Sequence, residues 1–243
     1  MPGMKVRRRT LAIVVTYVVA LHLLVFVAVW KSNFVLLARK TIGVEPPEER
    51  TLDLYQRMLG WAEVDAGVPE GSVLVLGDSI MHGLDAREIA PDAFGFGLGG
   101  ATIGTLVEGL PLLRSLGSAR AIVLGVGVND LKYRKPSEVA KDHAALLDAL
   151  PPGVAVVVVS VLPIDERADA TPGRSFVSND EIRSVNGALG ELCAGRAGCV
   201  FVDVSSTLAD EDGRLRREFH AGDGWHLSPA GNAVLAGAIR DAL

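Results

Sequence analysis

The sequence predicts a three-layer α/β/α domain with a five-stranded parallel sheet, preceded by one transmembrane helix. From residue 72 onward, short runs of Val, Ile and Leu alternate with longer segments of helical character. Continuous apolar runs are typical of parallel strands that are buried on both faces, and their alternation with helices builds a three-layer domain. A run of about twenty apolar residues near the N-terminus predicts the transmembrane helix.

The composition fits one folded domain with additional segments. The chain has 243 residues, of which 49% are hydrophobic, so it can bury a substantial core. The net charge is −5 and no long basic run occurs outside the extreme N-terminus, so no nucleic-acid partner is expected. Two cysteines, Cys193 and Cys199, are too few for a disulfide framework or a zinc site.

Residues 1–30 are predicted to form a cytoplasmic basic tail and a transmembrane signal anchor. A helix over residues 11–30 would span about 30 Å, the thickness of the hydrocarbon layer. The Lys and Arg residues before this run favour a cytoplasmic N-terminus, which places the rest of the chain outside the cytoplasm. A cleaved signal peptide is the alternative, although no small-x-small cleavage site follows the run closely.

Residues 31–70 are predicted to be a juxtamembrane connector. The Pro46-Pro47 pair would break a helix continuing from the membrane. After it, a stripe of apolar residues at helical spacing predicts a short amphipathic helix that packs on the main domain. The stripe consists of Leu52, Tyr55, Met58, Leu59 and Ala62.

The main domain is predicted over residues 71–243. Strands are expected at residues 73–76, 93–97, 121–125, 154–161 and 200–202. Helices are expected near residues 102–112, 137–150, 180–193 and 228–243. Ser178 or Asn179 can cap the third of these helices, and Ser228-Pro229 is a suitable opening for the last.

Candidate functional residues follow the predicted strands, at the edge where open α/β sheets bind ligands. Ser79, Gly100 and Asn129 follow the first, second and third strands, and Asp223 and His226 precede the last helix. His226 could take a proton from a nucleophilic Ser79 while Asp223 accepts the other ring N–H. The Ser79 and Gly100 backbone N–H groups and the Asn129 amide could form an oxyanion hole. An isolated Gly-Asp-Ser would otherwise be a helix cap.

Taken in order, these motifs resemble those of the SGNH/GDSL hydrolase family. Gly77-Asp78-Ser79-Ile80 is similar to its first block, Gly127-x-Asn129-Asp130 to its third and Asp223-x-x-His226 to its fifth. Gly100 is similar to the second-block glycine, although Ala101 stands where an acidic residue is often found, and Ile80 replaces the usual Leu. The resemblance covers residues 72–243. It implies a flavodoxin-like sheet and esterase, lipase or acyl-group chemistry, with no metal or cofactor.

A glycine-rich stretch gives a competing interpretation. Residues 95–100, Gly-Phe-Gly-Leu-Gly-Gly, fit the dinucleotide fingerprint G-x-G-x-x-G after a strand and before a helix. That fingerprint expects an acidic residue about twenty positions further on, whereas the sequence there is Ser118-Ala119-Arg120. Dinucleotide binding is therefore not expected.

Other polar residues near the motifs are expected to have structural roles. Asp78 and Asp130 should bond loop backbone. His82 is expected at the surface or in a pocket wall, and His143 on a solvated helix face, while His220 could line the cleft or not. The turn between Cys193 and Cys199 could bring them within disulfide range, or both could remain free thiols in the packing.

The sequence therefore predicts a membrane-anchored serine esterase. Ser79, His226 and Asp223 would hydrolyse a carboxylic ester through an acyl-enzyme. The extracytoplasmic location suggests O-acyl groups of envelope glycans or lipids as substrates. Two alternatives remain open: an acyltransferase that uses the same triad, and an inactive surface-binding module with the same fold.

Overall fold

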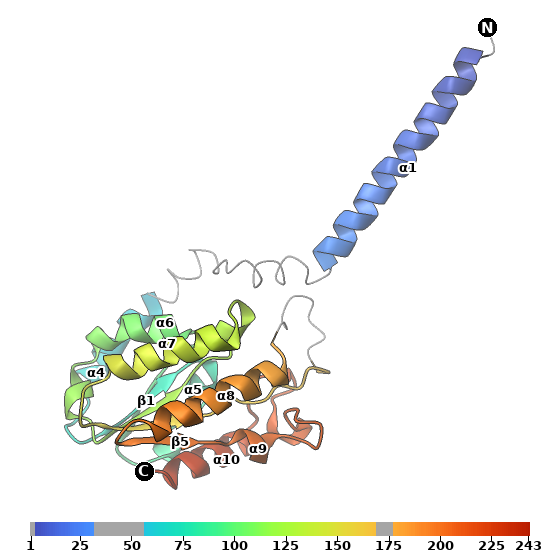
Figure 1. The fold of residues 1–243 in the computed structure, drawn as a ribbon. Coiled ribbons are helices and arrows are strands. Elements are labelled where there is room, and N and C mark those ends of the chain that lie inside the picture. The colour runs from blue at the N-terminus through green and yellow to red at the C-terminus, as the bar shows by residue number, and fades with distance from the viewer. Residues whose placement is uncertain (1–2, 32–55, 169–176) are drawn as a thin grey trace.

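A computed structural model describes residues 3–31, 56–168 and 177–243 of the chain. Its centre is a five-stranded parallel sheet with the strand order β2-β1-β3-β4-β5 (Figure 1). The strands are β1 Val73–Gly77, β2 Ala93–Gly97, β3 Ala121–Gly125, β4 Ala155–Val159 and β5 Cys199–Val202. This is the order of flavodoxin-like sheets. The predicted five-stranded parallel sheet is confirmed.

Helices cover both faces of this sheet. On one face lie α6 Ile103–Gly109, α7 Pro136–Ala149 and α8 Asn179–Ala194, and on the other lies α10 Pro229–Arg240 (Figure 1). The strand side chains alternate between the two layers: Leu74 and Leu76 pack with the first group of helices, Val73 and Val75 with α10. Shorter helices are α4 Trp61–Asp65, α5 Ser79–His82 and α9 Ser205–Leu208.

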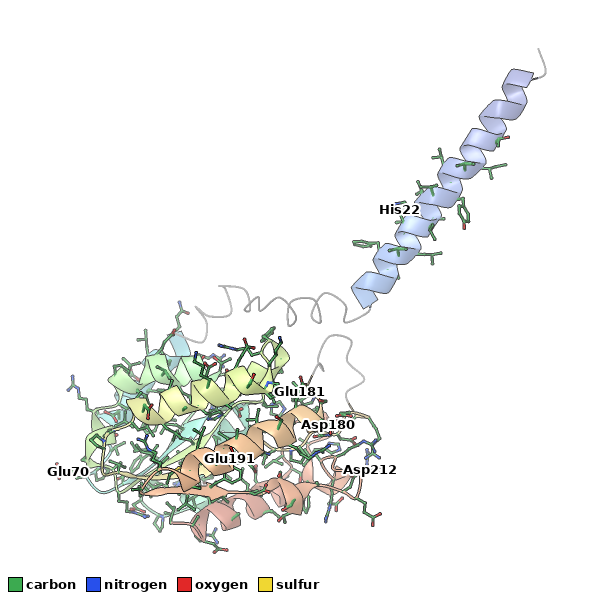
Figure 2. All side chains as sticks on the ribbon, in the orientation of Figure 1. His22, Glu70, Asp180, Glu181, Glu191 and Asp212 are labelled. Atoms are coloured by element: carbon green, nitrogen blue, oxygen red, sulfur yellow. A yellow bond between two sulfur atoms is a disulfide. The ribbon has the colours of Figure 1, made fainter. Side chains whose placement is uncertain are left out.

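The longer helices begin where the sequence supplies caps. Ser178 and Glu181 form a capping box at the start of α8, and Ser228 accepts a hydrogen bond from the Gly231 N–H at the start of α10. Figure 2 shows Asp180 and Glu181 in the first turn of α8, where negative charge is favourable for the helix dipole. The helix expected up to residue 112 ends earlier, because α6 gives way to a 3₁₀ turn that contains Pro111.

The segment before the first strand contributes to the core. Met58 and Trp61 are 1% and 5% exposed and belong to the same apolar cluster as β1 and α6. The Trp61 ring meets the Phe96 ring edge-on, with centroids 6.0 Å apart. Leu59, from the same predicted stripe, is exposed, while Leu52 and Tyr55 lie outside the described residues. Because Met58 and Trp61 are packed into the core, this part of the connector is held against the domain.

The N-terminal helix α1 comprises Gly3–Lys31, and Figure 2 shows His22 on it. The His22 ring nitrogen Nδ1 lies 2.7 Å from the Val18 carbonyl oxygen within the same helix. Among the residues that the structure describes, no helix combines the length and the apolar character that crossing a membrane requires. The transmembrane helix predicted over residues 11–30 is therefore not supported.

His143 contradicts the expectation of a solvated side chain. It is 1% exposed, on the face of α7 that also carries the buried Val139 and Leu146. Burial disfavours the charged imidazole and lowers the pKa of His143 to about 4. A Cβ on Gly127 would lie 3.1 Å from His143 Nε2, so this neutral ring packs directly beneath the loop that follows β3.

Cys193 and Cys199 form a disulfide. Cys193 lies in the last turn of α8 and Cys199 begins β5, with their Cα atoms 4.9 Å apart. Of the two arrangements that the sequence left open, the structure contains the bonded one. The bond ties the end of a covering helix to an edge strand of the sheet.

Candidate active site

Ser79 lies immediately beyond the carboxyl end of β1, at the first position of the short helix α5. The preceding Asp78 is extended and caps this helix, since its carboxylate accepts the Ile80 N–H at 2.9 Å. The turn requires glycine at position 77, because a Cβ there would lie 2.2 Å from the Gly125 oxygen and 2.4 Å from the Met81 Cγ. The close contact between β1, β3 and α5 thus determines where the Ser79 hydroxyl lies.

Ser79, His226 and Asp223 form a continuous hydrogen-bonded chain. His226 Nε2 lies 3.0 Å from Ser79 Oγ, and His226 Nδ1 lies 2.6 Å from Asp223 Oδ2. The other Asp223 oxygen accepts the backbone N–H groups of Trp225 and His226, at 2.9 and 3.0 Å. These distances are those of a serine, a base in contact with it and a carboxylate that orients the base.

The environment of Asp223 keeps its carboxylate ionised. Partial burial opposes the charge, but hydrogen bonds from the His226 ring and from two backbone N–H groups outweigh it and lower the pKa of Asp223 to about 2. An anion held at this position fixes the Nδ1–H tautomer of His226, which leaves Nε2 free to accept a proton from Ser79.

A cavity of about 570 Å³ opens beside Ser79. Ser79, Gly100, Asn129 and His226 all line it, although they come from four separate segments. Asp223 lies behind His226 and is not part of the lining. Much of the remaining wall is apolar: Ile80, Met81, Val126, Val128, Val161, Leu162 and Ile164. The structure therefore brings together all five residues that the motifs singled out.

Asn129 is held in one orientation by its neighbours. Its Nδ2 donates to the Ala101 carbonyl oxygen at 2.9 Å, and its Oδ1 accepts from Lys132 Nζ at 2.7 Å. An amide nitrogen has two protons, so one N–H remains for a group in the cavity. Gly100 has a φ of 83°, a left-handed conformation that favours glycine. Ser79, Gly100 and Asn129, which the sequence predicts as an oxyanion hole, all line the same cavity.

The floor of the site holds two buried carboxyl groups. Burial raises the pKa of Asp78 to about 6, although the Ile80 N–H and the charges of Lys132 and His226 oppose the shift. Burial likewise raises the pKa of Asp130 to about 7. Both Asp130 oxygens lie 3.2 Å from the Ile103 N–H at the start of α6. These groups bond backbone, as the sequence predicts, and hold the loops around Ser79.

His220 shapes the loop that carries Asp223 and His226. Its Nδ1 accepts the N–H groups of Gly222 and Gly224 at 3.0 and 3.3 Å, and the side chain is almost fully buried. Gly224 has a φ of 76°, and its oxygen accepts the Asp165 N–H at 2.9 Å. His220 is thus part of the support of this loop and does not line the cavity. The sequence did not decide whether His220 lines the cleft.

Two further cavity residues were missed by the sequence analysis. Arg57 comes from the connector, and Lys132 follows the Asn129 motif. Arg57 carries no sequence signal, because only the docking of Met58 and Trp61 brings it to the site. His82 is exposed, with its Nδ1 3.0 Å from the Gly97 oxygen. Among the described residues, no group of three or more potential ligands could hold a metal ion.

Comparisons with known proteins show which family and which fold this chain resembles. The model of the GDSL-like Lipase/Acylhydrolase family matches residues 75–234. No curated protein matches the chain. A solved structure described as a putative platelet activating factor from Streptococcus pneumonia shares 27% identity at a TM-score of 0.73, covering 80% of this chain and 95% of that chain.

More distant structures share the fold. A putative acylhydrolase from Bacteroides fragilis is 20% identical, with a TM-score of 0.60 over 75% of this chain and 93% of its own. The catalytic domain of a peptidoglycan O-acetyltransferase from Streptococcus pneumoniae is 18% identical, with a TM-score of 0.54 over 73% and 94%. The family match covers well over half of the chain, which therefore belongs to the GDSL-like lipase/acylhydrolase family of ester-hydrolysing enzymes.

Proposed function

We propose that this enzyme hydrolyses carboxylic esters through an acyl-enzyme on Ser79, with His226 as the base and Asp223 as its orienting carboxylate. The observation that carries the proposal is the chain from Ser79 Oγ to His226 to Asp223, with heavy-atom distances of 3.0 and 2.6 Å, at the wall of a cavity. The apolar part of the wall suits the acyl group of the substrate.

In the first half of the reaction, Ser79 Oγ attacks the ester carbonyl carbon and its proton passes to His226 Nε2. The oxyanion forms beside the Ser79 and Gly100 N–H groups and the Asn129 amide. The bond to the alcohol then breaks, and the alcohol leaves with the proton from His226. In the second half, His226 takes a proton from water while the water oxygen attacks the acyl carbon. The bond from this carbon to Ser79 Oγ then breaks, the proton on His226 passes to Ser79 Oγ, and the carboxylic acid leaves.

The nucleophile is tested with an active-site probe. A fluorophosphonate should label the wild-type enzyme but not the Ser79→Ala variant, and ester hydrolysis should be lost by several orders of magnitude in that variant. A matched control is Ser205→Ala, which removes a hydroxyl outside the cavity. Labelling that survives Ser79→Ala, or activity that depends on His82 instead of His226, would overturn the assignment.

Acyl transfer to an alcohol is the second function that this site supports. The His226 side chain is 44% exposed, so an acceptor hydroxyl can approach the base from the same side as water. Acyl release is measured with and without carbohydrate acceptors. Release that depends on an acceptor and yields an acylated sugar would identify a transferase, whereas release that is unchanged by acceptors identifies a hydrolase.

We also propose that the N-terminal segment attaches the enzyme to a membrane, with the catalytic domain outside the cytoplasm. This part rests on the sequence of residues 11–30 and the basic residues before it. O-acyl groups of envelope glycans or lipids would then be accessible substrates. Cell fractionation of the full chain and of a variant lacking residues 1–31 tests it. Recovery of the full chain in the soluble fraction would overturn this part alone.

A further inference from the structure

Residues 160–165, here called the wall segment, form an irregular stretch that is buried at every position. The segment follows β4, and four of its residues line the active-site cavity: Ser160, Val161, Leu162 and Ile164. A buried stretch outside regular structure leaves backbone N–H and C=O groups that require partners. Two asparagine side chains of α8 supply such partners.

Asn186 and Asn179 each bind both backbone groups of one residue in the wall segment. Asn186 Oδ1 accepts the Val161 N–H at 2.8 Å, and its Nδ2 donates to the Val161 oxygen at 2.9 Å. Asn179 makes the same pair of bonds to Ile164, both at 2.9 Å. The two asparagines are buried and lie two helical turns apart, on the same face of α8. Paired bonds of this kind fix both the position and the orientation of the backbone.

Val161 connects the first of these contacts to the loop of Asn129. A Cβ on Gly127 would lie 3.1 Å from Val161 Cγ2, so the Val161 side chain packs against the loop that carries Asn129. His143 Nε2 would lie equally close to that Cβ. The space beneath Gly127 is therefore filled, and the position of Asn129 depends on where Val161 is held.

Ile164 connects the second contact to the loop of the base. The next residue, Asp165, donates its N–H to the Gly224 oxygen at 2.9 Å. A Cβ on Gly224 would lie 2.6 Å from the Asp165 oxygen, so the two segments are in close backbone contact. Gly224 lies between Asp223 and His226 in the sequence. The position of the base therefore depends on where Ile164 is held.

We propose that Asn186 and Asn179 are positioning residues for the reaction, each acting on a different part of the active site. Asn186 places the oxyanion donor Asn129, and Asn179 places the base His226. This inference rests on the proposed esterase function and extends it to α8, from which no described residue lines the cavity. A displacement of about 1 Å can cost about 10²-fold in rate, so the loss of either pair of bonds should be measurable in kcat.

The test is a set of double-mutant cycles on kcat for 4-nitrophenyl acetate, measured with the full chain. Asn186→Ala should lower kcat about tenfold in the wild-type background, because Asn129 loses its alignment. In an Asn129→Ala background the same change should have little further effect, since the donor that it positions is already absent. In a His220→Ala background, which alters the other loop, the tenfold loss should remain.

Asn179→Ala should show the reverse pattern. We expect it to lower kcat about tenfold in the wild-type and Asn129→Ala backgrounds. In the His220→Ala background its effect should nearly vanish, because the Gly224 N–H has already lost its acceptor there and the base is displaced. The KM for the ester should stay nearly unchanged in both asparagine variants.

Leu189→Ala is the matched control on the same helix. Leu189 is fully buried in the core and has an apolar side chain, so this variant should lower Tm without changing kcat. Asn186→Ser and Asn179→Ser retain a polar group at the two buried positions. They provide the same cycles if an alanine variant does not fold.

The outcomes separate this inference from the proposed function. If Ser79→Ala retains ester hydrolysis, the esterase proposal fails. If hydrolysis depends on Ser79 and the asparagine variants keep the wild-type kcat, the positioning role is overturned. It is also overturned if Leu189→Ala lowers kcat equally, or if each asparagine variant loses the same factor in both mutant backgrounds.

Discussion

Asp223 and Asp130 lie in the same active-site region, yet their surroundings act on them in opposite directions. Asp223 is on the His226 loop, residues 220–226, where backbone and ring N–H groups lower its pKa to about 2. Asp130 is on the strand-end floor, made of Asp78, Asn129 and Asp130, where burial raises its pKa to about 7. Titratable groups whose environments separate their pKa values can take different roles in one site.

This difference in pKa explains why Asp223, and not Asp130, can orient His226 and stabilise its charged form. A carboxylate that stays charged stabilises the imidazolium that forms on His226, whereas a protonated one cannot. Asp223 fulfils this requirement and contacts the ring directly. The floor carboxyls instead bond the N–H groups of Ile80 and Ile103 and fix the loops around Ser79. The His226 loop therefore provides the charged carboxylate, and the carboxyl groups of the strand-end floor provide structural support.

The largest effect is expected when the loop carboxylate loses its charge. Asp223→Asn keeps the size of the side chain but removes the anion that selects the His226 tautomer, so kcat should fall about 10⁴-fold. Asp130→Asn, the same change on the floor, should lower kcat far less, because Asp130 does not contact His226. Steady-state kinetics on one ester measures both. Equal losses in the two variants would remove the distinction between loop and floor.

The second-largest loss of kcat is expected at Asn129, the residue of the strand-end floor that lines the cavity beside Ser79. Asn129→Ala should lower kcat about 10²–10³-fold with little change in KM, because a donor to the oxyanion is lost. Asn232→Ala is a suitable control, since Asn232 donates to the Gly83 oxygen and does not line the cavity. A change confined to KM would instead assign Asn129 to ground-state binding of the substrate.

A smaller effect is expected from the support of the His226 loop. His220→Ala removes the acceptor of the Gly222 and Gly224 N–H groups and lets Asp223 and His226 shift, which should lower kcat by up to about 10²-fold. His220→Asn should restore much of the rate, because its Oδ1 can accept in place of the ring nitrogen. KM and Tm are measured alongside. A loss of Tm with unchanged kcat would make His220 purely structural.

Much of the fold was predictable because its signals are local. β2 and β3 occupy the predicted residues, and Ser79, Gly100 and Asn129 follow strands whose parallel order brings them to one edge. The burial of His143 was also present in the sequence, since Val139 and Leu146 share its helix face. It was missed because polar neighbours suggested a solvated face.

Other features depend on tertiary contacts that no local pattern contains. Arg57 reaches Gly99 only because Met58 and Trp61 pack against the end of α6, beside Gly109. The role of His220 requires the reversed chain at Gly222 and Gly224. The raised pKa of Asp130 follows from burial, and a Gly-x-Asn-Asp motif does not reveal how deeply its last residue lies.

The last prediction concerns the pH dependence of stability, an effect that does not involve the reaction rate. Between pH about 4 and 7, Asp130 is ionised in the unfolded chain but holds its proton in the folded one. The unfolded state then binds fewer protons, so the free energy of unfolding falls as pH rises through this window, by at most about 1.4 kcal/mol per pH unit for one group. Asp130→Asn should flatten that slope in chemical denaturation, because an amide does not titrate.

Asp92→Asn removes a carboxyl group whose pKa is shifted in the opposite direction, downward instead of upward. The hydrogen bond from Arg120 lowers the pKa of Asp92, so the stability that this carboxylate contributes is present above the unfolded pKa and is lost as pH falls. Its replacement should alter the acid side below pH about 4 and leave the window up to pH 7 unchanged. If Asp130→Asn leaves the slope between pH 4 and 7 as steep as in the wild type, the floor does not hold Asp130 protonated, and the contrast with the His226 loop disappears.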